Sequence, residues 1–160
     1  MAKGSLTDSA ESQDFSRLYR EEGPRLWRAV FAFAQDREIA SDAVAEAFAQ
    51  CIRRGDAIRD PGAWVWRASF RIAAGALKDR RRWSELTVEP SYEMPEAPSC
   101  LIDALRSLPA QQRATLVLCH YAGYDTTEIA SILGIARATV RVHLSRGRRK
   151  LRTLLEAPDA

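Results

Sequence analysis

The sequence has few of the residues that build metal centres and disulfide frameworks. Its 160 residues include three cysteines, Cys51, Cys100 and Cys119. They are widely spaced, and none belongs to a Cys-x-x-Cys pair or a Cys/His cluster, the spacings that zinc sites use. An odd number of scattered cysteines is typical of free thiols in a reducing compartment. We therefore expect no metal, no cofactor and no disulfide.

Histidine is also scarce, which weakens the case for an enzyme. His120 follows a cysteine and His143 lies in a basic segment, and these are the two histidines of the chain. Neither has a Cys, His or Asp neighbour at the spacing of a catalytic group. The sequence therefore disfavours catalysis, and a histidine on the face of a helical bundle is the simpler interpretation of His120.

Long apolar runs and leader segments are missing as well. No apolar stretch approaches the roughly 20 residues of a membrane-spanning helix. The N-terminus lacks the charged-then-apolar pattern of a signal peptide. Hydrophobic residues make up 46% of the chain and charged residues 28%, as in ordinary globular proteins. These features predict a cytoplasmic protein of one or two small domains.

Acidic residues are unevenly distributed. The net charge is only +3, yet residues 100–156 contain nine Lys/Arg against four Asp/Glu. From Ala136 to Leu155 there is no acidic residue. Local basic segments of this kind are typical of contact with phosphate groups, where local charge sets the affinity.

This basic segment closes a predicted helix-turn-helix. Asp125 can cap a first helix while Glu128 bonds back to the cap amide, and apolar residues at helical spacing follow in 129–133. Gly134 suits the left-handed turn that ends a helix. A second helix, roughly Arg137 to Arg152, turns Val140 and Leu144 inward. Its outer face carries Arg137, Thr139, Arg141 and His143, and then Arg146, Arg148, Arg149, Lys150 and Arg152.

A polar, basic second helix in this motif fits the major groove of DNA and offers side chains to base edges. The alternative is an amphipathic helix pair whose basic face is merely solvated. The capping pattern, the glycine turn and the basic helix together favour DNA binding.

The periodicity predicts an all-α fold with two small helical domains joined by a flexible linker. Residues 1–13 are predicted to be a disordered tail. Residues 14–82 form the first domain, with helices broken at Gly23-Pro24 and continuing to about Gln35, then over about 39–53 and 61–82. Residues 83–99 hold three prolines and four glutamates without Lys or Arg, and form an acidic linker. Residues 100–156 form the second domain, with helices over 101–108 and about 111–121 before the helix-turn-helix.

The helix over 61–82 places aromatic rings beside basic side chains. Trp64, Trp66 and Phe70 are accompanied by Arg67, Arg71, Lys78 and Arg80. Rings that stack on unpaired bases, with cations for the backbone, are typical of proteins that bind single-stranded nucleic acid. The alternative is that the rings are core anchors. We expect Trp64 in the core, and the sequence leaves Trp66 and Phe70 open between the two roles.

Taken together, the two halves resemble a bacterial RNA polymerase sigma factor of the small extracytoplasmic-function (ECF) type. The resemblance to region 4 of that family is carried by Leu108-Pro109 with Arg113, Tyr121-Ala122-Gly123-Tyr124, Glu128-Ile129-Ala130, Gly134-Ile135, Thr139-Val140-Arg141 and Leu144-x-Arg146-x-Arg148. The looser resemblance to region 2 is carried by Asp42-Ala43-Val44-Ala45-Glu46-Ala47-Phe48 and Pro61-Gly62-Ala63-Trp64-Val65.

The resemblance implies a transcription initiation factor that acts with core RNA polymerase on promoter DNA, under control of an anti-sigma factor. It assigns −35 base contacts to Arg137, Thr139, Arg141 and His143. Phosphate contacts fall to Thr126, Thr127, Arg146, Arg148, Arg149 and Lys150. Contacts with the opened −10 strand fall to Trp66, Arg67, Phe70, Arg71, Lys78 and Arg80. Core polymerase binding falls to Asp42, Glu46 and Phe48.

The chain departs from the family pattern at Ala45, Arg71, Gly75, Ala136 and Ala138, which implies a diverged promoter preference. The alternative function is a conventional helix-turn-helix regulator. Residues 14–82 would then serve as a sensor or dimerisation domain, and the chain would bind palindromic duplex DNA without polymerase.

Overall fold

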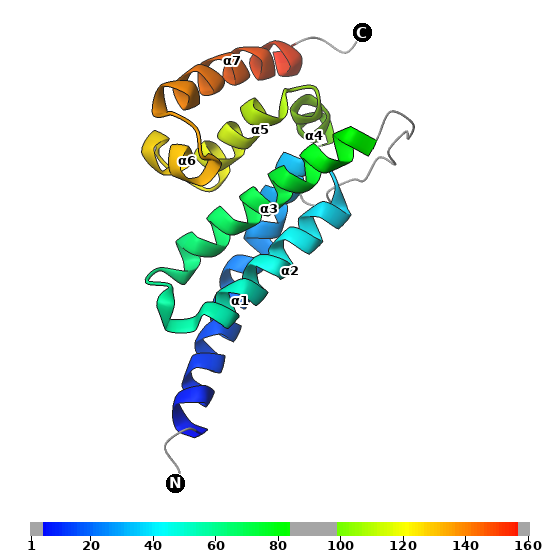
Figure 1. The fold of residues 1–160 in the computed structure, drawn as a ribbon. Coiled ribbons are helices and arrows are strands. Elements are labelled where there is room, and N and C mark those ends of the chain that lie inside the picture. Colours follow the sequence, from blue (N-terminus) through cyan, green and yellow to red (C-terminus); the bar gives the residue numbers. More distant parts are fainter. Residues whose placement is uncertain (1–4, 84–98, 157–160) are drawn as a thin grey trace.

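The computed structural model describes residues 5–83 and 99–156, and every regular element in them is helical. Figure 1 shows the helices of the N-terminal half (residues 5–83) lying beside the helices of the C-terminal half (residues 99–156). The predicted all-α class is confirmed. None of the helices in the described residues is both long and apolar enough to cross a bilayer.

The N-terminal half is an antiparallel bundle of α1 (Ser5–Ala34), α2 (Arg37–Arg54) and α3 (Pro61–Trp83). A single 3₁₀ turn, η1 (Gly55–Ala57), connects α2 to α3. The Asp36 carboxylate caps α2 by accepting a hydrogen bond from the Ile39 amide at 2.8 Å. Small residues on one face of α2, such as Ala40, Ala43 and Ala47, are buried and let the helices approach closely.

The predicted break at Gly23-Pro24 is wrong, because α1 continues through Pro24 as one helix of 30 residues. A proline inside a helix removes one backbone hydrogen bond and costs about 3 kcal/mol. The apolar face beyond it compensates, since Leu26, Val30 and Phe31 are fully buried against the bundle. The helix also begins at Ser5 and so extends into the segment predicted as a disordered tail.

The C-terminal half comprises α4 (Ser99–Arg106), α5 (Ala110–Leu116), α6 (Thr126–Leu133) and α7 (Arg137–Glu156). The helix predicted over 111–121 changes character half way. After α5 it widens into a π turn, η2 (Val117–Tyr121), closed by a 3.1 Å hydrogen bond from the Ala122 amide to the Val117 carbonyl. Gly123, at φ 78°, then ends the segment as predicted.

The two halves are in contact through α1 and α3. Helix α1 packs against α4, α5 and η2, and α3 packs against α6. Buried side chains of both halves form one continuous hydrophobic cluster. A buried arginine, Arg113 of α5, also joins the halves by donating to the carbonyls of Leu108 and of Phe33 at the end of α1. Residues 84–98, most of the predicted linker, lie outside the described part of the chain.

Candidate nucleic-acid interface

The helix-turn-helix forms as its local sequence predicts. The Asp125 carboxylate accepts from the Thr127 and Glu128 amides at 2.8 and 2.9 Å, and the Asp125 amide donates to the Glu128 carboxylate at 2.8 Å. This reciprocal pair satisfies amides at the start of α6 that have no partner within the helix. Gly134 adopts φ 67° and ψ 34°, the left-handed conformation that ends α6 and starts the turn.

Helix α7 is fixed by a narrow buried face. Val140 and Leu144 are buried, and Gly147 continues the same face one turn later. A β-carbon on Gly147 would lie 3.0 Å from Cδ1 of Leu116 in α5. Gly147 therefore permits the close approach of α7 to α5, a role that went unpredicted although a lone glycine in a basic helical run is a visible signal.

The side chains predicted to read bases flank the buried face of α7 on two sides, with Arg137 and Arg141 on one side and Thr139 and His143 on the other. Arg137, Thr139 and Arg141 are exposed, and His143 is half-buried. Arg137 is already ordered, because its Nε donates to the Thr126 hydroxyl at 3.0 Å. Thr126, predicted to contact phosphate, thus also braces a neighbouring arginine and keeps its own hydroxyl proton for another acceptor.

The predicted phosphate contacts divide into two groups. Thr127, Arg146 and Arg149 are exposed, and their side chains make no polar contact with the rest of the described residues. Arg148 instead donates to Nε2 of His120 at 3.2 Å, and Lys150 donates to the Ser107 carbonyl at 2.8 Å. These two side chains hold α7 on the body of the C-terminal half, and each keeps further N–H donors for a phosphate.

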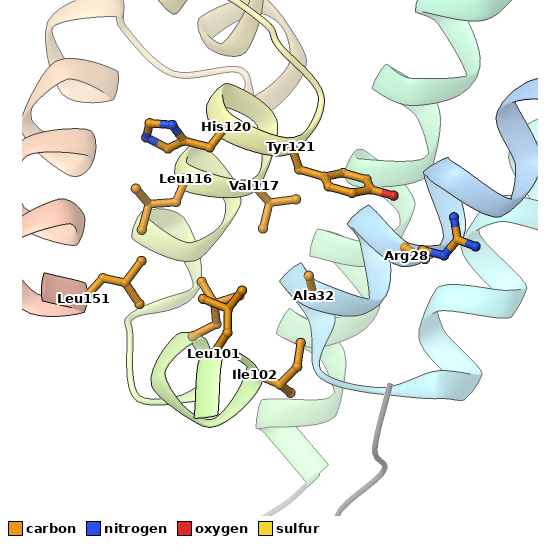
Figure 2. Close-up of a pocket in the computed structure, with 10 residues that line it drawn as sticks. Arg28, Ala32, Leu101, Ile102, Leu116, Val117, His120, Tyr121 and Leu151 are labelled. Atoms are coloured by element: carbon orange, nitrogen blue, oxygen red, sulfur yellow. The ribbon is translucent and has the colours of Figure 1, made fainter. Parts of the chain in front are cut away.

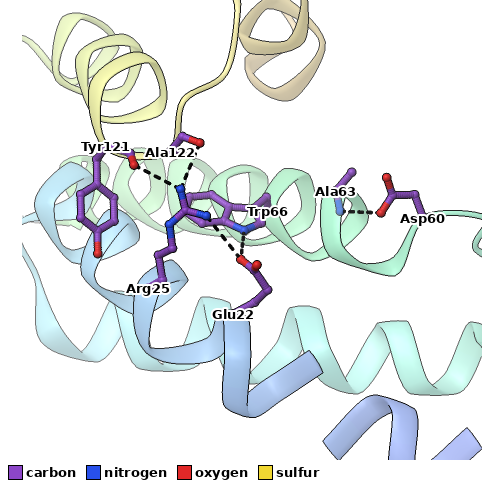
Figure 3. Close-up of polar contacts among 7 residues, drawn as sticks. All are labelled: Glu22, Arg25, Asp60, Ala63, Trp66, Tyr121 and Ala122. Atoms are coloured by element: carbon purple, nitrogen blue, oxygen red, sulfur yellow. Dashed lines mark hydrogen bonds and ion pairs between the residues drawn. The ribbon is translucent and has the colours of Figure 1, made fainter. Parts of the chain in front are cut away.

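Two aromatic rings predicted to stack on single-stranded DNA lie in the protein core. Trp66 is 2% exposed and Phe70 is fully buried. Phe70 stacks on Phe33 with ring centres 5.4 Å apart, and the Trp66 indole donates to the Glu22 carboxylate at 2.9 Å (Figure 3). Rings enclosed in this way cannot stack on a base, so the prediction for Trp66 and Phe70 is wrong for this arrangement.

The basic side chains of α3 are also partly engaged. Arg71 donates to the Ser131 carbonyl of α6 at 3.2 Å, and Arg80 forms an ion pair with Asp36 at the start of α2. Lys78 is exposed. Arg67 is half-buried, and its Nε finds no hydrogen-bond partner in the described residues.

A cavity of about 300 Å³ lies beside the turn from α2 to α3. Trp64, Arg54, Arg59 and Arg67 contribute to its wall. The Arg54 guanidinium lies 5.5 Å from the centre of the Trp64 ring, and Trp64 is half-buried and packs against the core. The sequence signal for this site was the cluster of arginines around the loop at residues 54–59.

The outer face of α2 carries the predicted polymerase-binding carboxylates. Asp42 and Glu46 are exposed, whereas Phe48 is 5% exposed and packs edge-on against Tyr19 at 4.9 Å. Hydrogen bonds from Gln50 and then from Arg53 lower the pKa of the Glu46 carboxyl below its ordinary value of 4.5. Phe48 is therefore a core residue that supports α2 from within, and the two carboxylates form the accessible surface.

Between the halves lies an apolar cavity of about 330 Å³. Figure 2 shows Ala32 of α1 on one side and Ile102, Leu116, Val117 and Leu151 of the C-terminal half on the other. The halves therefore touch without closing completely over this region.

Comparison with known proteins agrees with this architecture. A family model described as Sigma-70, region 4, matches residues 99–151. The chain is 29% identical over 175 aligned positions to the ECF RNA polymerase sigma factor SigL of Mycobacterium tuberculosis, covering 98% of this chain and 97% of SigL. It is 27% identical over 163 positions to the RNA polymerase sigma-E factor of Streptomyces coelicolor, covering 93% and 90%.

Among solved structures, the sigma factor RpoE of Bartonella quintana, in complex with the anti-sigma factor NepR, is similar with a TM-score of 0.74. Their sequences are 21% identical, and the match covers 92% of this chain and 99% of RpoE. At that identity the similarity concerns the fold alone, and the matched region extends over both halves of this chain. Residues 99–151 thus match sigma-70 region 4, and the chain as a whole is similar to ECF sigma factors over nearly its full length.

Proposed function

We propose that this protein is an alternative sigma factor that binds core RNA polymerase and directs it to promoters. The observation that carries the proposal is the exposed basic face of α7, within a chain that aligns from end to end with ECF sigma factors. The RNA is made by the polymerase, and the chain supplies recognition. This role places the protein in the cytoplasm, with the polymerase.

Helix α7 would read the −35 element in the major groove. Arg137 and Arg141 have the planar donor fork that pairs with O6 and N7 of guanine, and the Thr139 methyl group can contact thymine. Arg146 and Arg149, further along the helix, would bind phosphates and so fix the register without reading sequence.

The opened −10 strand would bind at the other half. The cavity beside Trp64 combines a half-buried indole with the cations of Arg54, Arg59 and Arg67 and the carboxylate of Asp60, and we propose that the aromatic ring and the excess of cations take a base and its phosphate. Lys78 on α3 would extend the basic track.

Core polymerase would bind the outer face of α2. Asp42 and Glu46 present carboxylates for a basic partner, and the Glu46 side chain is held in place by Gln50 at 2.8 Å and Arg53 at 3.0 Å. A charged group that is already ordered loses less entropy on binding. We propose an anti-sigma factor as the inhibitor of this chain, because the similar sigma factor RpoE was solved in complex with the anti-sigma factor NepR.

Reconstituted transcription tests this function. The purified chain, added to sigma-free core polymerase with a promoter library, should produce transcripts from a defined subset of promoters. The double variant Asp42→Ala/Glu46→Ala should lower core binding, whereas Asp103→Ala, which removes an exposed carboxylate of α4, should not. Failure to bind core, together with tight dimeric binding to palindromic duplex DNA, would identify a conventional helix-turn-helix regulator instead.

A further inference from the structure

The side of α7 directly opposite its buried face carries none of the residues assigned to DNA bases. Val140 and Leu144 are buried, and Val142 lies two residues from each of them. An α-helix turns by about 100° per residue, so the Val142 side chain points about 160–200° away from theirs. Ala138, four residues earlier, and Ser145, three residues later, lie on the same side and are also exposed. We call Ala138, Val142 and Ser145 the outer line of α7.

Val142 is an apolar side chain on a helix surface that is otherwise polar and basic. It is 44% exposed, so burial within the chain does not explain a valine at this position. Helix formation does not explain it either, because a β-branched side chain loses rotational freedom in a helix and forms helices less well than alanine. These two properties favour a contact of Val142 with another molecule.

The neighbours of Val142 on the outer line are short. Ala138 and Ser145 carry the smallest side chains that alanine and serine can offer at positions i−4 and i+3, the ones that lie beside residue i on a helix. The valine therefore stands above its surroundings, and the helix backbone can approach an opposing surface closely. Helix α7 packs on α4, α5 and α6, and the outer line faces away from that packing (Figure 1).

Cations flank the valine on both sides. Arg141 precedes Val142 and points about 100° to one side, while Arg146 follows four residues later and points about 40° to the other. Both arginines are exposed. An apolar group between cations is complementary to a polyanion that presents methyl groups between its phosphates. Duplex DNA has this arrangement, because the C5-methyl group of thymine projects into the major groove between the two strands.

We propose that Val142 is a specificity-determining residue, whose methyl groups contact the C5-methyl group of one thymine in the duplex that α7 binds. The proposal rests on the proposed function, since it names a base that this helix reads. Ala138 and Ser145 permit the close approach, and the flanking arginines supply the polar contacts. Thr139 points about 60° away from Val142 around the helix, so it meets a different base.

Replacement of thymine by uracil tests the proposal, because uracil lacks the C5-methyl group and keeps the hydrogen-bonding groups of the base. A randomised duplex library is first selected for binding to the full-length chain without polymerase. The best duplex is then synthesised with each thymine replaced in turn by uracil, and fluorescence anisotropy gives the Kd of each. At one thymine the native chain should bind the uracil duplex roughly fourfold more weakly, as expected for the loss of one buried methyl group.

Val142→Ala should bind the thymine and uracil duplexes equally at that position. Val142→Thr keeps one methyl group on a branched side chain and should retain the preference for thymine. The matched control is Leu154→Ala, which shortens a 39% exposed side chain in the last turn of α7 and should keep the native ratio of Kd values. These are changes of exposed side chains, so helical circular dichroism should match that of the native chain.

Equal Kd values for thymine and uracil duplexes at every position would overturn the proposal in the native chain itself. A ratio that persists in Val142→Ala would also overturn it, as would a ratio that Thr139→Ala abolishes in place of Val142→Ala. A selection that enriches no sequence would mean that α7 does not read bases, and the role of Val142 would fall with it. Failure of the proposed function has a different signature, in which the Kd ratios behave as expected yet the chain supports no transcription with core polymerase.

Discussion

Arg141 and Arg149 lie on one helix and are both exposed, yet they have different expected roles in DNA binding. Arg141→Ala should cost about 1–3 kcal/mol on the preferred −35 sequence and relax the preference at one base position. Arg149→Ala should weaken all duplexes similarly and reduce the salt dependence of binding. Equal losses for Arg141→Ala on preferred and scrambled DNA would contradict its role in reading bases.

Lys150 is a poor choice for that comparison. Its ammonium group donates to the Ser107 carbonyl at 2.8 Å, so its removal would loosen α7 as well as any phosphate contact. The basic residues of α7 look alike in the sequence. In the structure Arg148 donates to His120 and Lys150 donates to the carbonyl of Ser107, partners that lie far away along the chain.

The Glu46 carboxyl has a lowered pKa, and this has a defined effect on pH dependence. A lowered pKa in the folded state stabilises the fold above the unfolded value, and that contribution disappears as the pH falls through the folded value. The Glu46 titration followed by NMR should therefore have a midpoint below 4.5. Because the hydrogen bond from Gln50 is the largest cause, Gln50→Ala should raise the midpoint more than Arg53→Ala. The reverse order would show that the ion pair dominates.

Two glycines in different elements should respond oppositely to the same substitution. Gly75 lies inside α3, and a β-carbon there would meet nothing within 4 Å. Gly75→Ala should stabilise the fold by about 0.5–1 kcal/mol, because alanine loses less backbone entropy in a helix. Gly134 has φ 67°, where a side chain is strained, and Gly134→Ala should destabilise by about 1–2 kcal/mol.

Urea denaturation of the two variants provides the measurement. A stabilising Gly134→Ala would mean that the turn between α6 and α7 does not need its left-handed residue.

The element boundaries that followed local rules, such as the capping box at Asp125 and the stop at Gly134, could be predicted from sequence. The continuous α1 could not, since the packing that offsets Pro24 comes from distant residues of α2 and α3.

At the scale of the whole molecule, Arg113 couples the halves from within. It is 7% exposed and donates to carbonyls of Leu108 and of Phe33 across the interface. Arg113→Ala should lower the free energy of unfolding by about 2–4 kcal/mol, because buried carbonyls lose their donor. Arg106→Ala, which removes an exposed arginine paired with Asp103, should change it by less than about 0.5 kcal/mol.

Calorimetry shows whether the two halves unfold together in one thermal transition or separately in two. The halves share one hydrophobic cluster, so the native chain should unfold in a single transition, and Arg113→Ala should separate it into two. Two transitions already present in the native chain would show that the interface contributes little to stability.

The sequence was least informative about contacts between the halves. Trp66 and Phe70 were open between a core role and a base-stacking role, and nothing local could decide between them. Their partners Glu22, Phe33 and Tyr124 lie in helices or loops far away along the chain. The helix-turn-helix, in contrast, depends on neighbours within about one turn, and its residues were identified from spacing alone.

The π turn at Val117–Tyr121 fits one residue more into its ring than an α-helix would. That single extra residue sets the angle at which the Tyr121 and Ala122 carbonyls face α1. Deleting one residue from the turn would let α5 continue with ordinary geometry and rotate everything downstream by about 100° relative to α5. The Arg25 guanidinium of α1, which donates to these two carbonyls at 3.3 and 3.2 Å, would then face a different part of the backbone. A change of one codon in length, leaving every side chain proposed to contact DNA intact, would change how the two halves meet.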